Sequence, residues 1–102
     1  MRTSMTHAIR YTLSGEGALR DELMRKADLC AAALLEARRI SAAAMFSELY
    51  AQLAARIADM LDDLDETLLA LDHRSDRAGY ERVVALHAGF EELETRRAQL
   101  GT

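Results

Sequence analysis

The sequence predicts an all-α protein: a three-helix antiparallel bundle that is completed by dimerisation and preceded by an extended segment at the amino terminus. Composition supports this fold class, because the 102 residues include no proline and alanine and leucine together supply 35 of them. Both residues favour helices, whereas proline interrupts them. Apolar residues also recur at helical spacing from residue 46 to residue 71. A chain of this length supports one core, so we expect a single helical domain over residues 18–102.

Residues 1–17 differ from the rest of the chain. Serines and threonines dilute their helix propensity, and Gly15 and Gly17 close the segment. Ile9, Tyr11 and Leu13 alternate with polar residues, which is the period of a half-buried strand. Such a strand would need a partner strand from a twin subunit or another protein, and disorder is a second interpretation. A third is a helix with an apolar face made of Met5, Ala8, Ile9, Thr12 and Leu13.

The first helix is expected near residues 17–39, with Leu23, Cys30 and Leu34 on its apolar face. The helical pattern then changes phase around residues 38–42. We therefore predict a break there, with Ser41 as the amino-terminal cap of the next helix. No glycine or proline enforces this break, so one bent continuous helix is the alternative.

The second helix, predicted over residues 41–72, has the most regular apolar stripe in the chain. Its members are separated by three or four residues over seven turns, as one face of a helix requires. They are Phe46, Leu49, Leu53, Ile57, Met60, Leu64, Leu68 and Leu71. A helix this long exceeds the diameter of a small globule, so we expect another long helix or another chain to cover the stripe.

The third helix is expected to begin after Ser75 or Asp76, either of which can cap it. Its apolar positions again recur every three or four residues, and Gly89 within it marks either a close helix crossing or a tolerated sequence change. Together the second and third helices supply the residues that we predict at an interface with a second chain. These are Leu49, Tyr50, Leu53, Ile57, Met60, Leu64, Leu68, Tyr80 and Phe90.

Negative charge is concentrated on the second helix. Residues 57–73 contain six acidic side chains and no lysine or arginine, while the whole chain has a net charge of −4. Asp59, Asp62, Asp63 and Glu66 share one side of the helix at positions i, i+3, i+4 and i+7. We expect this acidic face to steer a basic partner protein, with solvation alone as the competing explanation.

Motifs of enzymes and cofactor sites are missing from the sequence. It has no nucleophile elbow, glycine-rich phosphate loop or Cys-x-x-Cys pair, and the three histidines have no metal-ligand spacing. The single Cys30 lies on an apolar face, where a buried small hydrophobe is expected. We therefore expect no enzyme activity, no cofactor and no metal.

Composition also restricts the surroundings of the protein. The longest strictly apolar run, residues 29–35, is far shorter than the roughly 20 residues that span a bilayer. An acidic chain without a basic stripe is a poor candidate for direct contact with nucleic acid. A single cysteine and the lack of an apolar leader segment favour the cytoplasm.

Two functions from different classes agree with these observations. The first is a small regulatory protein that sequesters a partner protein through apolar helix faces, similar in size and charge to bacterial antiactivators, secretion chaperones and toxin-neutralising proteins. The second is a helical enzyme or ligand-binding bundle whose site is built across a dimer. Its residues would be Glu48, Arg56, His73, Arg74 and Arg77.

Overall fold

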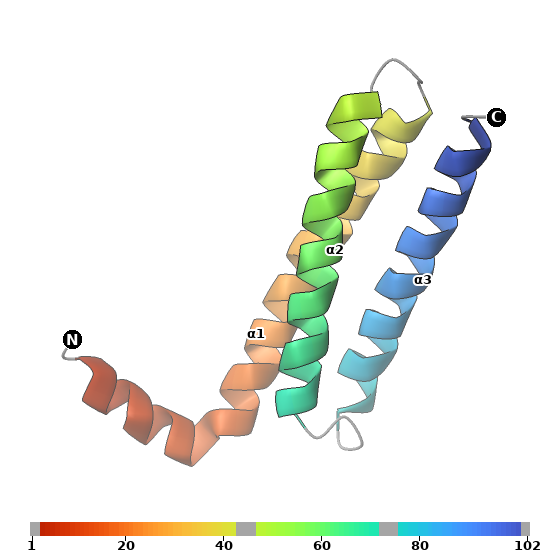
Figure 1. Cartoon of the computed structure of the whole chain (residues 1–102). Coiled ribbons are helices and arrows are strands. Elements are labelled where there is room, and N and C mark those ends of the chain that lie inside the picture. The colour runs from red at the N-terminus through yellow and green to blue at the C-terminus, as the bar shows by residue number, and fades with distance from the viewer. Residues whose placement is uncertain (1–2, 43–46, 72–75, 101–102) are drawn as a thin grey trace.

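Three helices make up the computed structural model of the chain: α1 (Thr3–Ser41), α2 (Ser47–Ala70) and α3 (Arg77–Leu100). The structure describes the backbone of residues 3–42, 47–71 and 76–100, and the side chains within these ranges from residue 17 to residue 99. No strand occurs in these ranges. The helices run antiparallel to their neighbours in sequence, and both α2 and α3 lie against α1 (Figure 1). The predicted fold class, an all-α three-helix bundle, is confirmed.

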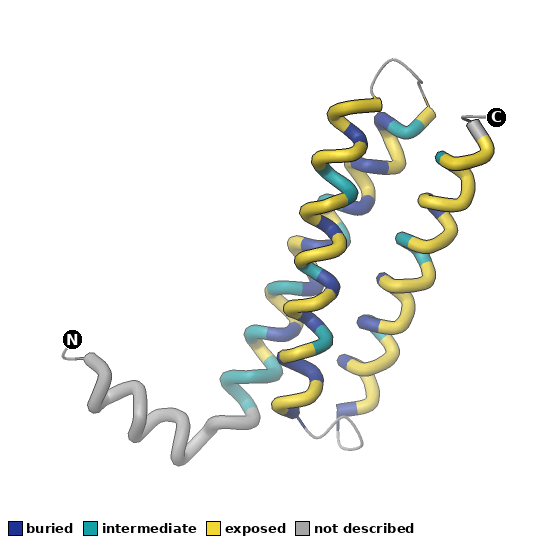
Figure 2. The backbone as a smooth tube through the Cα atoms, in the orientation of Figure 1, coloured by how far each residue is buried: buried dark blue, intermediate teal, exposed yellow. Residues whose placement is uncertain are grey.

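The core lies along the axis between the three helices (Figure 2). Each helix contributes one apolar face, as the spacing predicts, and the buried arc of α2 is wide because this helix packs against both neighbours. The buried residues of α1 are Leu23, Ala27, Cys30, Leu34, Ala37 and Ile40. The buried apolar residues of α2 are Tyr50, Ile57, Leu61, Leu64 and Leu68, with Leu71 directly after the helix, and those of α3 are Val83, Leu86 and Leu93.

The boundary between the first two helices differs from the prediction. α1 continues to Ser41 and α2 begins at Ser47, so the prediction that Ser41 caps the second helix is wrong. The Ser41 hydroxyl instead donates a 3.0 Å hydrogen bond to the Arg38 carbonyl, one turn back in α1. The change of phase does mark two separate helices, but the break comes a few residues later. Phe46, the first member of the predicted stripe, lies outside the described residues.

The amino-terminal segment is also helical in the structure. α1 begins at Thr3, so the structure gives residues 9–13 as part of a helix. Helix propensity at single serines and threonines is a weak preference that neighbouring turns outweigh. The division of the chain into an extension of residues 1–17 and a domain of residues 18–102 stays a prediction.

The start of α3 confirms the cap predicted at Asp76. Its Oδ1 accepts a hydrogen bond of 3.3 Å from the backbone N–H of Gly79, the third residue of the helix. Its Oδ2 lies 3.6 Å from Nε of Arg20 in α1, which is too long for a hydrogen bond but within ion-pair range. The carboxylate therefore both caps α3 and ties its first turn to α1.

Glycines allow α3 to lie close to α1 at two points. A Cβ at Gly79 would stand 2.6 Å from Cδ2 of the buried Leu23, and a Cβ at Gly89 would stand 3.2 Å from Cδ2 of Leu34. The first distance is shorter than real Cβ atoms tolerate, so only glycine fits at position 79 without displacing its surroundings. Gly89 marks a helix contact, as its place in the predicted third helix suggests.

Candidate protein interface

Most of the apolar stripe predicted on the second helix is buried inside the single chain. Ile57 and Leu64 have no exposed surface, and Leu68 is 8% exposed. α1 and α3 cover these side chains, and α3 has the same length of 24 residues as α2. The length of α2 therefore does not by itself require a second chain, although dimerisation stays a prediction. A partner could reach Ile57 or Leu64 only by displacing one of the chain's own helices.

The remaining members of the stripe lie at its edges. Leu53, Met60 and Phe90 are partly buried and pack against the core, whereas Leu49 is 50% exposed. Met60 also lines a groove of about 260 Å³ between α1 and α2, together with the half-exposed Leu29. The exposed part of the predicted stripe is therefore smaller than the regular spacing of its residues suggests.

Tyr50 is a polar anchor within the bundle. It is buried in α2, and its hydroxyl donates a 2.5 Å hydrogen bond to Oε2 of Glu94 in α3. Burial, followed by the hydrogen bond to Glu94 and its negative charge, raises the pKa of the phenol well above its ordinary value of 10.0. The ring also lies under the guanidinium of Arg97, whose Cζ is 5.0 Å from the ring centroid.

Arg97 joins all three helices at this end of the bundle. It comes from the last turn of α3, and Nη1 donates a 2.8 Å hydrogen bond to the carbonyl of Ser41, the last residue of α1. Nη2 donates a 3.0 Å hydrogen bond to Oγ of Ser47, the first residue of α2. The side chain thus bridges the two ends of the connection between α1 and α2.

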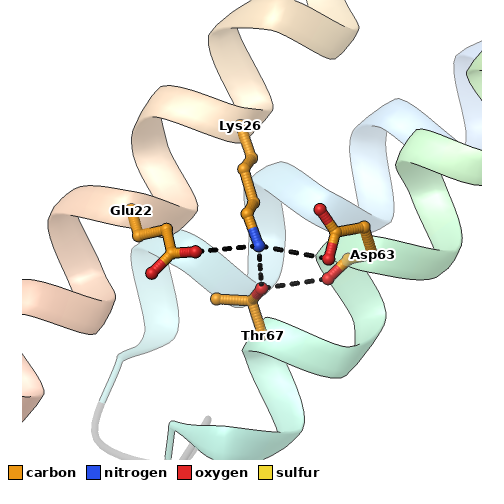
Figure 3. Close-up of polar contacts among 4 residues, drawn as sticks. All are labelled: Glu22, Lys26, Asp63 and Thr67. Atoms are coloured by element: carbon orange, nitrogen blue, oxygen red, sulfur yellow. Dashed lines mark hydrogen bonds and ion pairs between the residues drawn. The ribbon is translucent and has the colours of Figure 1, made fainter. Parts of the chain in front are cut away.

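One member of the predicted acidic face, Asp63, belongs to a polar cluster between α1 and α2 (Figure 3). Nζ of Lys26, the chain's single lysine, donates to Oε2 of Glu22 at 3.0 Å, Oδ1 of Asp63 at 3.1 Å and Oγ1 of Thr67 at 3.0 Å. The Thr67 hydroxyl donates in turn to the Asp63 carbonyl at 3.0 Å. All three N–H donors of the ammonium are therefore used.

This cluster changes the ionisation of Lys26. Partial burial lowers the pKa of the ammonium, but the hydrogen bonds to Glu22 and Asp63 and the charges of both carboxylates raise it, and the net result is a raised pKa. Lys26 is thus held as a cation at the contact between α1 and α2. Asp63 serves the fold, so three of the four residues of the predicted acidic face are available to a partner.

Those three residues, Asp59, Asp62 and Glu66, are exposed on α2. No ion pair involves them within the described part of the chain. Asp65, which the sequence did not single out, instead binds His87 of α3 through contacts of 2.9 and 3.1 Å to Nε2. The outer side of α2 therefore carries negative charge that forms no ion pair among the described residues.

The structure brings two predicted interface residues, Leu68 and Tyr80, to one pocket between α2 and α3. The pocket has a volume of about 280 Å³, and Asp65 and Leu69 complete the lining that the structure describes. Leu69 is 78% exposed and Tyr80 is 42% exposed. Val84, one turn after Tyr80 on α3, is 47% exposed. We refer to Leu69, Tyr80 and Val84 as the Leu69 patch.

Two residues of the Leu69 patch were missed by the periodicity of the sequence. Leu69 and Val84 directly follow the buried Leu68 and Val83, so each is the second of two identical apolar residues. On a helix, neighbours in sequence point about 100° apart, and both can be buried only if the helix packs on a wide surface. An apolar pair of this kind is the signal that identifies them.

The residues proposed for a ligand site across a dimer are not gathered in the single chain. Glu48 and Arg56 are exposed on α2. Arg77 is exposed at the start of α3 and forms a 3.0 Å ion pair with Glu81. His73 and Arg74 lie outside the described residues.

Comparison with known proteins finds no matching family model, no similar curated protein and no similar solved structure. Among the side chains that the structure describes, between residues 17 and 99, no three of histidine, cysteine, aspartate or glutamate are placed to hold a metal ion. None of the described helices has the length and apolar character that crossing a membrane requires.

Proposed function

We propose that the protein is a small non-enzymatic interaction module, of the antiactivator or chaperone type, that acts by binding another protein. The single observation that supports this most is the Leu69 patch, where two helices leave large apolar side chains exposed around a shared pocket. Exposed aromatic and aliphatic side chains next to a pocket are typical anchors of protein interfaces. We also propose a homodimer located in the cytoplasm, as the sequence suggests.

The Leu69 patch is a better candidate surface than the α2 stripe for a physical reason. Binding through Ile57 and Leu64 would first require the core to open, which costs much of the marginal stability of a small domain. Binding through Leu69 and Tyr80 requires no such change, because both are exposed in the folded chain. Tyr80 is the predicted interface residue that this surface retains, and the buried Leu68 lines the pocket beside it.

The test compares two variants of exposed apolar side chains. Leu69→Ala with Tyr80→Ala removes most of the patch, and Leu35→Ala removes a side chain of α1 that is 65% exposed. Proteins captured from the native host should be recovered with the parent chain and with Leu35→Ala, but lost with the double variant. Light scattering over a wide concentration range gives the mass of each protein. Equal recovery with the double variant would contradict the proposal.

A ligand-binding bundle is the second candidate, and one observation favours it. A groove of about 450 Å³ runs between α1 and α3, with Leu34 and Leu86 among the residues that line it and Arg38 and Arg82 as cations. Arg82 is paired with Asp28 at 2.9 Å, whereas no ion pair of Arg38 occurs among the described residues. A thermal-shift screen of anionic metabolites tests this function, because a ligand at about 100 times its Kd stabilises the fold by about 2.7 kcal/mol.

A further inference from the structure

The surface along which α2 and α3 lie side by side, here called the α2–α3 groove, includes the pocket lined by Leu69 and Tyr80 and changes from apolar to acidic along its length. At one end lies the Leu69 patch, and next along the groove His87 and Asp65 pair across it. One turn further, α3 carries Glu91 and α2 carries Asp62, both exposed. Neither carboxylate has a hydrogen bond or ion pair within the described residues.

Helix geometry sets the distance between the Leu69 patch and the two carboxylates, Asp62 and Glu91. Glu91 follows Val84 by seven residues, which is about two turns or roughly 10 Å along α3. Asp62 precedes Leu69 by seven residues on the antiparallel α2, so apolar and acidic positions are matched on both sides of the groove. The same separation, i to i+7, joins side chains on one face of any α-helix that lies along the groove.

We infer that the partner segment bound here is a basic amphipathic helix, with apolar side chains on the Leu69 patch and lysine or arginine about two turns away, opposite Asp62 and Glu91. This inference rests on the proposed function and names the chemistry of its partner. The apolar half supplies buried area, and the basic half pairs with carboxylates that the bundle leaves without a cation. An acidic helix would instead meet like charges at Asp62 and Glu91.

The test uses two synthetic helical peptides as probes. One has leucines over two turns followed by lysines over the next two turns, and the other has glutamate at every lysine position. Binding to the full chain is followed by fluorescence anisotropy at low and at physiological salt. We expect the leucine–lysine peptide to bind, to weaken about tenfold or more as salt rises, and the leucine–glutamate peptide not to bind.

Three variants locate the site. Leu69→Ala with Tyr80→Ala should reduce affinity for the leucine–lysine peptide at least about tenfold, the order expected for interface anchors. Asp62→Asn with Glu91→Gln should reduce it about tenfold at low salt and much less at high salt. The control, Asp21→Asn with Glu92→Gln, removes the same charge from exposed positions of α1 and α3 and should change affinity less than twofold. Circular dichroism verifies that each variant is folded.

Several results would overturn the inference. One is equal loss of affinity in the control and the Asp62/Glu91 variant, which would indicate attraction to net charge alone. Another is self-association of the chain through the Leu69 patch, because the occupant would then be a second copy. If neither peptide binds, but capture of a natural partner still requires Leu69 and Tyr80, the inference fails while the proposed function stands.

Discussion

Gly79→Ala provides the sharpest test of how α3 is seated on α1. The new Cβ would lie 2.6 Å from Cδ2 of Leu23, 2.7 Å from Oδ2 of Asp76 and 3.1 Å from Cγ of Asp76. Leu23 has no exposed surface, and the Asp76 side chain is only 9% exposed, so neither can turn freely into solvent. Either the first turn of α3 must shift or the cap must be lost.

The magnitude follows from opposing contributions. Overpacking a filled core costs typically about 1–3 kcal/mol, and loss of an amino-terminal cap costs about 1 kcal/mol. Alanine is favoured over glycine within a helix by about 1 kcal/mol, which offsets part of this cost. We expect the free energy of unfolding to fall by about 1–3 kcal/mol, which lowers Tm by several degrees in a domain of this size.

Two other glycines serve as matched controls. At Gly89 a Cβ would lie 3.0 Å from Nη2 of Arg38, the end of a flexible exposed side chain, and 3.2 Å from Cδ2 of Leu34. At Gly17 nothing lies within 4 Å. Gly89→Ala should therefore be close to neutral, and Gly17→Ala should stabilise by up to about 1 kcal/mol.

Urea unfolding followed by far-UV circular dichroism measures all three variants. The expected order of stability is Gly17→Ala, then Gly89→Ala, then Gly79→Ala. If Gly79→Ala is as stable as Gly89→Ala, the close approach of α3 to Leu23 is wrong, and the reasoning about this helix contact fails with it.

Three further predictions concern side chains inside the bundle. The raised pKa of Tyr50 means that the folded state holds the phenolic proton more tightly than the unfolded chain does. The stability that this proton contributes is complete below pH 10. It is lost as the pH rises above that value, by at most about 1.4 kcal/mol per pH unit. Tyr50→Phe should flatten this alkaline loss relative to the parent protein in unfolding curves between pH 8 and pH 11, and an unchanged slope would exclude the proposed ionisation. Lys26→Met should lower the free energy of unfolding by about 0.5–1 kcal/mol. Asp63→Asn should cost less in the Lys26→Met background than in the parent chain. Strict additivity of the two changes in a double-mutant cycle would show that the two side chains do not interact. Cys30 is buried and burial raises the pKa of its thiol, so a thiol-specific reagent should react at the rate of unfolding, and fast reaction with the native protein would contradict this burial.

The helices were predictable because their apolar positions are regular. Leu23, Cys30 and Leu34 in α1 and Ile57 and Leu64 in α2 all fall on the expected faces and are all buried. Periodicity reports which side of a helix is apolar, and in a three-helix bundle that side meets the axis. The prediction of the fold class therefore needed no information from relatives.

The helix boundary and the candidate surface were harder to predict. Ser41 has the residue type of an amino-terminal cap, yet it ends α1, and the Arg97 contact that its carbonyl receives comes from a residue 56 positions away. The α2 stripe appears identical whether its partner is another chain or the same chain, because periodicity carries no information on what covers a face. An apolar pair in the sequence points to a candidate, but which member of the pair is exposed depends on how α2 and α3 rotate against each other, and only the packed structure gives that rotation.

Arg97 also bears on the cooperativity of folding. The hairpin of α1 and α2 contains most of the core, but the hydrogen bonds that Arg97 donates to Ser41 and Ser47 form only when the last turn of α3 is in place. The last turn of α3 thus stabilises the end of the hairpin where α1 meets α2, although α3 is not adjacent to α1 in sequence. Fraying of α3 at this end would loosen the junction between α1 and α2 as well, so local opening of the three helix ends should occur as one event.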